Sequence, residues 1–126
     1  MFDFDNEPSF SRTDRVAREI QRILATLLQR EVKDPRLQGV TITDCKVSKD
    51  LSVCKVYFDV LGADRDSPQV AEALAGFDKA RGFLRSALGK QLRLRLTPEL
   101  RFYYDEVPEK ANEIDALIAK ALRRDR

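Results

Sequence analysis

The chain has 126 residues, which is enough for one domain with a modest hydrophobic core but too few for a large enclosed catalytic cavity. Charged residues make up 35% of it and the net charge is only +2, a sum that hides acidic ends and a basic middle. The sequence has no histidine, its two cysteines lack zinc-site spacing, and no apolar run approaches the roughly 20 residues of a membrane span. We therefore expect a cytoplasmic protein without a metal or cofactor.

The first predicted element is a helix that follows a flexible tail of residues 1–11 and runs to about Glu31. Ser11 or Thr13 can cap its start, and Asp34-Pro35 ends it. Its apolar face is formed by Val16, Ile20, Ile23, Leu24, Leu27 and Leu28. The opposite face carries a basic stripe formed by Arg15, Arg18 and Arg22. Glu19 lies close enough to pair with one of these arginines, so the stripe is partly neutralised. An RNA contact and an ordinary exposed helix face are equally good interpretations of this stripe.

Two strands are predicted next, at residues 40–47 and 51–61, joined by a turn at Ser48-Lys49-Asp50. The second strand alternates apolar and polar residues, and its apolar members are Cys54, Val56, Phe58 and Val60. Cys45 has the parity to share their buried face. In a chain of this size, Cys45 and Cys54 are interpreted as reduced, buried thiols rather than as a disulfide framework.

The second half of the chain predicts three helices and one strand. Ser67 is suited to cap a helix with Pro68 in its first turn, which gives helices at about 68–80 and 82–92. A strand follows at 99–105, with Leu100, Phe102 and Tyr104 on one face, and a last helix at about 109–123. The expected class is α+β, in the order α-β-β-α-α-β plus a C-terminal helix, with the helices on one face of a sheet.

Ala80-Arg81-Gly82 interrupts what would otherwise be one long helix. Val70, Leu74 and Phe77 form an apolar stripe before it, and a second stripe in a new phase follows it, made of Phe83, Leu84, Ala87 and Leu88. Glycine costs about 1 kcal/mol relative to alanine in a helix, so Gly82 is expected to have a structural reason. We expect a kink at Ala80 and Gly82.

A basic run surrounds this kink. Glu99 is the only acid between residues 79 and 101, whereas the cations there are Lys79, Arg81, Arg85, Lys90, Arg93, Arg95 and Arg101. Such a concentration of positive charge suits phosphate. A second candidate surface is the open face of the sheet, where aromatic and basic side chains alternate, namely Lys46, Lys55, Tyr57, Arg101 and Tyr103. Tyrosines that merely lie on a sheet, or a face covered by the C-terminal helix, are the alternatives there.

The sequence resembles the ribosome-binding factor A family over about residues 12–106. The matching blocks are Arg15-Val16-Ala17, Gln29 to Leu37, Lys49-Asp50-Leu51, Lys55-Val56-Tyr57, Lys79 to Lys90 and Pro98 to Asp105. The resemblance implies a type II KH-like fold in which an Ala-x-Gly kink, here Ala80-Arg81-Gly82, replaces the G-x-x-G loop that clamps RNA in KH domains. It also implies a KH-like domain at 12–106 and a C-terminal helical extension at 107–126.

The resemblance further implies a non-catalytic assembly factor that binds the small ribosomal subunit and its rRNA during late rRNA maturation. We expect a monomer without a membrane or small-molecule partner, whose RNA-binding residues are Lys79, Arg81, Arg85, Lys90, Arg93, Arg15, Arg18 and Arg22. A protein–protein adaptor that uses its basic face for an acidic partner is the alternative. An RNA-processing enzyme is disfavoured because Asp105 and Glu106 have no candidate nucleophile or metal set beside them.

Overall fold

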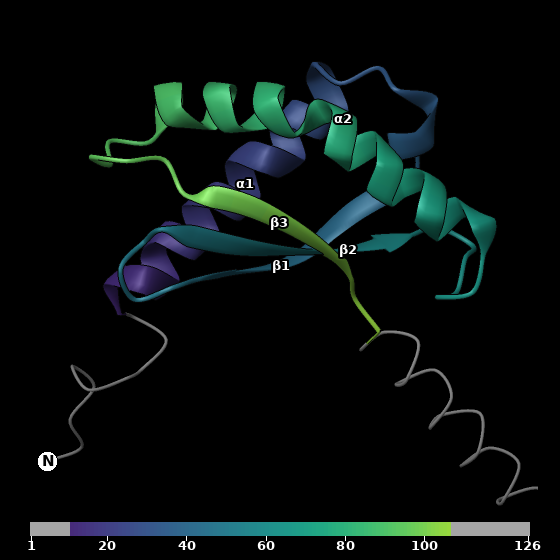
Figure 1. Cartoon of the computed structure of the whole chain (residues 1–126), viewed down its shortest axis with the longest axis horizontal. Coiled ribbons are helices and arrows are strands. Elements are labelled where there is room, and N and C mark those ends of the chain that lie inside the picture. Colours follow the sequence, from purple (N-terminus) through teal and green to yellow (C-terminus); the bar gives the residue numbers. More distant parts are fainter. Residues whose placement is uncertain (1–10, 107–126) are drawn as a thin grey trace, which may run out of the picture.

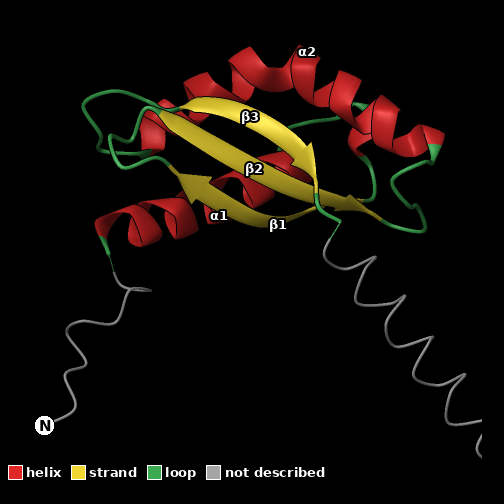
Figure 2. Ribbon diagram, turned by 60° about the horizontal axis from the view of Figure 1, so that its bottom comes forward, coloured by secondary structure: helices red, strands yellow, loops and turns green. Residues whose placement is uncertain are grey.

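A computed structural model describes residues 11–106 of the chain. The elements are α1 (Arg12–Arg30), a short 3₁₀ helix η3 (Pro35–Leu37), β1 (Val40–Val47), β2 (Val53–Val60), α2 (Pro68–Gln91) and β3 (Glu99–Tyr104). Figure 1 shows both long helices on the same side of the sheet, and Figure 2 shows the strands in front of them with the other face uncovered by a described helix. The expected α+β class is confirmed. The C-terminal helix and nearly all of the N-terminal tail lie outside the described residues, and the domain limits at residues 12 and 106 stay a prediction.

Helix α1 begins and ends where the sequence predicted. Ser11 is its N-cap, and the Ser11 hydroxyl accepts a hydrogen bond from the Asp14 backbone N–H at 3.2 Å. The buried residues recur every three or four positions and are Ala17, Ile20, Ile23, Leu24 and Leu27. After the helix, Asp34 caps η3 by accepting a hydrogen bond from the Arg36 backbone N–H, so the Asp34-Pro35 segment turns the chain toward β1.

The sheet has the order β1-β2-β3, with β1 antiparallel and β3 parallel to the central β2. A parallel neighbour requires a crossover connection, which α2 supplies. A bulge between Ile42 and Asp44 shifts the register of β1. The face toward the helices is apolar and buried, and its members include Ile42, Cys45, Cys54, Val56, Phe58, Leu100 and Phe102.

Cys45 and Cys54 lie on this buried face as free thiols. A hydrogen bond with Cys54 and burial both raise the pKa of the Cys45 thiol, so Cys45 stays protonated and unreactive. This agrees with the interpretation of both cysteines as structural.

Helix α2 corrects the expectation of two helices. Residues 68–91 form one continuous helix, and its ribbon changes direction within the helix instead of breaking (Figure 1). Its buried positions keep a single helical spacing, at Val70, Ala73, Phe77, Leu84 and Leu88. Leu74 and Phe83, which were assigned to the apolar stripes, are instead 38% and 47% exposed. The apparent change of phase arose because these two exposed residues were counted as core.

Gly82 also differs from its expected role. Its backbone is helical, and a Cβ built there would meet nothing within 4 Å. Gly76, six residues earlier, makes the close approach: a Cβ there would lie 3.1 Å from Leu37 Cγ and 3.3 Å from Arg36 Cβ. Gly76 therefore lets α2 pack against η3, whereas Gly82 faces open space.

Aromatic rings attach α2 to the sheet. Phe77 stacks on Phe102 of β3, with ring centroids 4.3 Å apart and planes at 9°, and lies 5.0 Å from the ring of Phe58. Phe58 and Phe77 are fully buried, and burial of such a side chain contributes about 1.5–3 kcal/mol. This cluster fixes the middle of α2 above β2 and β3, and so positions the basic residues that follow Phe77.

Candidate nucleic-acid interface

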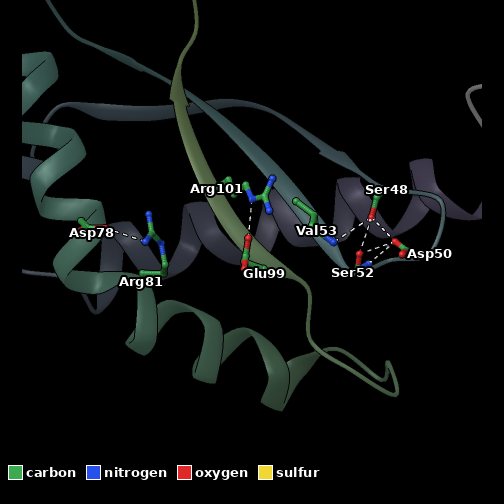
Figure 3. A network of polar contacts seen from close by, with 8 residues as sticks. All are labelled: Ser48, Asp50, Ser52, Val53, Asp78, Arg81, Glu99 and Arg101. Carbon is green, nitrogen blue, oxygen red and sulfur yellow. Dashed lines mark hydrogen bonds and ion pairs between the residues drawn. The ribbon is translucent and has the colours of Figure 1, made fainter.

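Arg81 lies at the boundary between α2 and β3. Its guanidinium is paired with Asp78 at 2.9 Å (Figure 3) and lies 5.8 Å from the centre of the Phe102 ring. The side chain remains 44% exposed. The ion pair and the ring orient the guanidinium, but Asp78 also neutralises part of its charge. Arg81 thus combines a structural contact, over the edge of the core, with an accessible cation.

Arg85 lies one turn further along the same side of α2. Its guanidinium donates a hydrogen bond to the Thr97 carbonyl oxygen at 2.8 Å, and the side chain is exposed. Thr97 also packs close to Gly89, where a Cβ would lie 2.6 Å from Thr97 Oγ1. Residues 92–98, which carry Arg93 and Arg95, are therefore held against the last turns of α2. Arg93 in this loop and Lys90 in the last turn of α2 are both exposed.

Lys79 does not join Arg81 and Arg85 in one cluster. It lies on the other side of α2, around a hollow of about 510 Å³ lined by Glu31, Val32, Lys33, Asp34, Pro35, Arg36, Lys79, Ala80 and Phe83. The Arg36 guanidinium and backbone N–H bind the Asp34 carboxylate and hold its pKa at about 2. The structure therefore divides the expected first site into two sides of one helix, because each residue turns the helix by about 100°.

The three arginines of α1 lie on its exposed face, as the sequence predicted. Arg22 is 3.9 Å from Glu19, a distance typical of a weak surface pair. Arg15, Arg18 and Arg22 therefore form a second basic surface on a separate helix.

The open face of the sheet carries the remaining basic and aromatic residues. Lys46, Lys55 and Arg101 are exposed there, and Tyr57 and Tyr103 lie beside them with ring centroids 5.7 Å apart. Arg101 is paired with Glu99 at 2.6 Å (Figure 3), and this pair lowers the pKa of Glu99. Asp44 of β1 and Asp59 of β2 lie on the same face, so its positive charge is concentrated at Lys46, Lys55 and Arg101 and does not extend over the whole face.

The carboxylates after β3 have structural partners. Asp105 accepts a hydrogen bond from the Thr43 hydroxyl, and its backbone N–H donates to the Phe58 carbonyl oxygen. Glu106 is paired with Arg65 at 3.0 Å. Within residues 11–106, no group of three or more cysteine, aspartate or glutamate side chains is arranged to hold a metal ion. In the same part of the chain, no helix is long and apolar enough to cross a membrane.

The roles of three residues that shape this region were missed from the sequence. Gly76 sets the approach of α2 to η3, Thr97 accepts the hydrogen bond from Arg85, and Phe102 supports Arg81. A buried glycine in a helix was the one signal available, because Gly76 falls among the apolar positions of α2. The other two contacts join residues distant in sequence and leave no local pattern.

A family model described as ribosome-binding factor A matches residues 12–118. The chain belongs to the ribosome-binding factor A family. It is 49% identical over 114 residues to ribosome-binding factor A of Hydrogenovibrio crunogenus, covering 90% of this chain and 94% of that one. It is 50% identical over 117 residues to the protein of the same name from Alcanivorax borkumensis, covering 93% and 84%.

Solved structures of ribosome-binding factor A share the fold. The crystal structure of the Thermus thermophilus protein matches with a TM-score of 0.64 and 29% identity, over 73% of this chain and 93% of that one. A homology model of the Thermus thermophilus protein, fitted into a cryo-EM map of a 30S–RbfA complex, matches with a TM-score of 0.57 and 30% identity, over 71% and 90%. The order α-β-β-α-β, with a bent second helix, is consistent with the KH-like arrangement expected for this family.

Proposed function

We propose that this protein is a non-catalytic assembly factor that binds the small ribosomal subunit and its rRNA during late maturation of the rRNA. Its membership of the ribosome-binding factor A family supports this, as does the fitting of the Thermus thermophilus relative into a map of a 30S–RbfA complex. The protein acts as a cytoplasmic monomer, through a KH-like domain that lacks a G-x-x-G loop.

The observation that carries the RNA contact is the surface formed by α2 and the loop after it. Arg81, Arg85, Lys90 and Arg93 are exposed there, and the first two are held in place by Asp78, Phe102 and Thr97. Cations that are oriented before binding lose less conformational freedom when they meet phosphate. Lys79 on the other side of α2, and Arg15, Arg18 and Arg22 on α1, extend the contact to neighbouring phosphates.

Binding requires no chemical step. A protein that binds one conformation of the immature particle more tightly than the other shifts the particle toward that conformation. The size of the shift is set by the difference between the two affinities. It leaves when the RNA surface changes shape. This mechanism needs only a rigid basic surface, which the continuous helix α2 and its aromatic attachment to β3 provide.

Sedimentation of the tagged full-length chain through a ribosome gradient tests this function. We expect the protein to migrate with free small subunits and not with translating ribosomes. Arg81→Glu with Arg85→Glu should reduce this co-migration. The matched control is Arg30→Glu with Arg65→Glu, which makes the same change in charge at exposed positions outside the proposed contact and should bind as the wild type does.

Binding to protein-free rRNA separates this function from that of an adaptor for an acidic protein. We expect the purified chain to bind small-subunit rRNA with an affinity that falls as salt rises, because cations on the protein release counterions from phosphate. Binding to intact subunits but not to protein-free rRNA would indicate the adaptor instead.

A further inference from the structure

Three cations form a row across the open face of the sheet. Lys46 of β1 is the register partner of Lys55 of β2, and Lys55 is the register partner of Arg101 of β3. Neighbouring strands lie about 4.8 Å apart, so the row places three basic side chains within about 10 Å. All three are exposed. Their separation in sequence hides this row, which only strand pairing creates.

Such a row is unfavourable for the sheet itself. Like charges directly opposite one another on neighbouring strands destabilise their pairing. Glu99 pairs with the Arg101 guanidinium at 2.6 Å and offsets part of its charge. The Lys46 ammonium lies 5.7 Å from the centre of the Tyr57 ring, a distance that permits a cation–π interaction. Glu99 pairs with one cation of this row and Asp44 lies in the neighbouring row, so two carboxylates face three cations. The row itself keeps an excess of positive charge that an anionic ligand would neutralise.

The next row of the same face holds two aromatic rings and one acid, Asp44 of β1, which is the register partner of Tyr57. Tyr57 and Tyr103 are register partners on β2 and β3, with ring centroids 5.7 Å apart and planes at 31°. Tyr103 is 40% exposed. A hollow of about 500 Å³ adjoins the two rows and is lined by Lys46, Val47, Ser48, Val53, Lys55, Tyr57 and Arg101. Rings therefore lie immediately beside the cations, with open space above them.

We propose that this face is a second nucleic-acid site, which binds single-stranded RNA. Lys46, Lys55 and Arg101 hold the phosphates, and unpaired bases stack on Tyr57 and Tyr103. Cations that follow the backbone, next to aromatic rings that accept bases, are the two components of single-strand recognition. The site lies on the side of the sheet away from α1 and α2 (Figure 2), so it is separate from the α2 surface. It rests on the proposed function only in assuming that the partner is RNA.

Binding of short labelled RNAs to the full-length chain, followed by fluorescence anisotropy, tests this site. We expect an oligouridine to bind more tightly than an RNA duplex of equal charge, because a duplex keeps its bases stacked. Tyr103→Leu should weaken oligouridine binding about 5-fold to 100-fold, the usual contribution of one stacked base. Tyr103→Phe keeps the ring and is the matched control, which should bind within about 2-fold of the wild type.

Salt dependence tests the cation row independently. Lys55→Gln should lower the slope of log affinity against log salt by about 0.7, the value for one phosphate contact to a single strand. Arg81→Glu with Arg85→Glu should leave oligouridine binding close to that of the wild type. Loss of subunit co-migration in that α2 variant, with oligouridine binding retained, would support two separate sites.

Three results would overturn the proposal. They are wild-type oligouridine binding by Tyr103→Leu and, in the Arg81→Glu with Arg85→Glu variant whose α2 surface is weakened, equal affinity for oligouridine and duplex, and equal affinity for oligouridine and polyglutamate. The last result would show a general anion or acidic-protein surface. If the wild-type chain fails to co-migrate with small subunits but binds oligouridine through Tyr103, the proposed function fails and the single-strand site stands.

Discussion

Alanine at Gly82 should stabilise this protein, although the sequence alone suggested that a glycine is needed there. Gly82 has a helical backbone, is exposed, and leaves open space around an added Cβ. Alanine is favoured over glycine in a helix by about 1 kcal/mol. With no strain or clash to offset this gain, Gly82→Ala should raise the free energy of unfolding by about 0.5–1 kcal/mol. For a domain of this size, this corresponds to about 3–6 °C in Tm.

Gly76→Ala is the matched comparison, because it makes the same change in the same helix. There the new Cβ would lie 3.1 Å and 3.2 Å from Leu37 Cγ and Cδ2, which is closer than ordinary contact. Leu37 is only 6% exposed, and its side chain would have to shift by a few tenths of an ångström to accept the new Cβ. Overpacking of this kind costs about 1–3 kcal/mol and exceeds the gain in helix propensity. Gly76→Ala should therefore destabilise the protein by about 1 kcal/mol.

Urea unfolding of the wild type and the two variants, with thermal melts beside it, measures both effects. Subunit co-migration of Gly82→Ala should match that of the wild type, because we expect the bend of α2 to depend on its packing against the sheet and not on glycine at position 82. A Gly82→Ala variant that is less stable than the wild type by about 1 kcal/mol or more, or that loses subunit binding, would refute this reasoning. It would show that the bend depends on glycine at this position.

Three further predictions follow from the described contacts. Arg81→Glu with Arg85→Glu should weaken subunit binding and flatten its salt dependence. The double change should lower the free energy of unfolding by about 1 kcal/mol, because the contacts with Phe102 and Thr97 are lost. Unchanged affinity and salt slope would place the site elsewhere. Replacing Cys45 and Cys54 with alanine should leave rRNA binding intact and lower the free energy of unfolding by a few kcal/mol at most. Loss of rRNA binding by the folded variant would reveal a chemical role for these thiols. Asp34, with its pKa lowered from 3.8 to about 2 mainly by the Arg36 hydrogen bond, favours folding above about pH 4, and this contribution is lost as the pH falls through 2. Asp34→Asn should make the urea midpoint less sensitive to pH in this range, and an unchanged pH profile would mean that the pair with Arg36 does not form in solution.

The elements with strong local signals were predicted well from the sequence. The cap at Ser11, the stop at Asp34-Pro35 and the alternation from Cys54 to Val60 each involve neighbouring residues, and each appears in the structure at the expected place. Family blocks spread over residues 12–106 carried the identification, which the family model and the curated relatives confirm. The exposure of Arg15, Arg18 and Arg22 was also correct, because the opposite face of α1 is clearly apolar.

The prediction for α2 failed where local and tertiary effects compete. Leu74 and Phe83 are apolar and stand near the core positions, so the sequence counted them as buried and inferred a change of phase. Gly82 drew attention because it interrupts a helical pattern, whereas Gly76, the residue with close neighbours, falls among the apolar positions of the same helix, a weaker signal that was passed over. Which glycine matters depends on where Leu37 lies, and Leu37 is distant in the chain.

The sequence by itself determined the class of fold, the start and end of most elements, the family and the basic character of the middle of the chain. These properties follow from periodicity, capping and composition, which act over a few residues or over the whole chain. Tertiary structure decided how the charges are grouped. It separated Lys79 from Arg81 by the turn of one helix, and it brought Lys46, Lys55 and Arg101 into one row through strand pairing. A charged surface depends on which distant segments lie side by side, and packing of the apolar faces sets that arrangement.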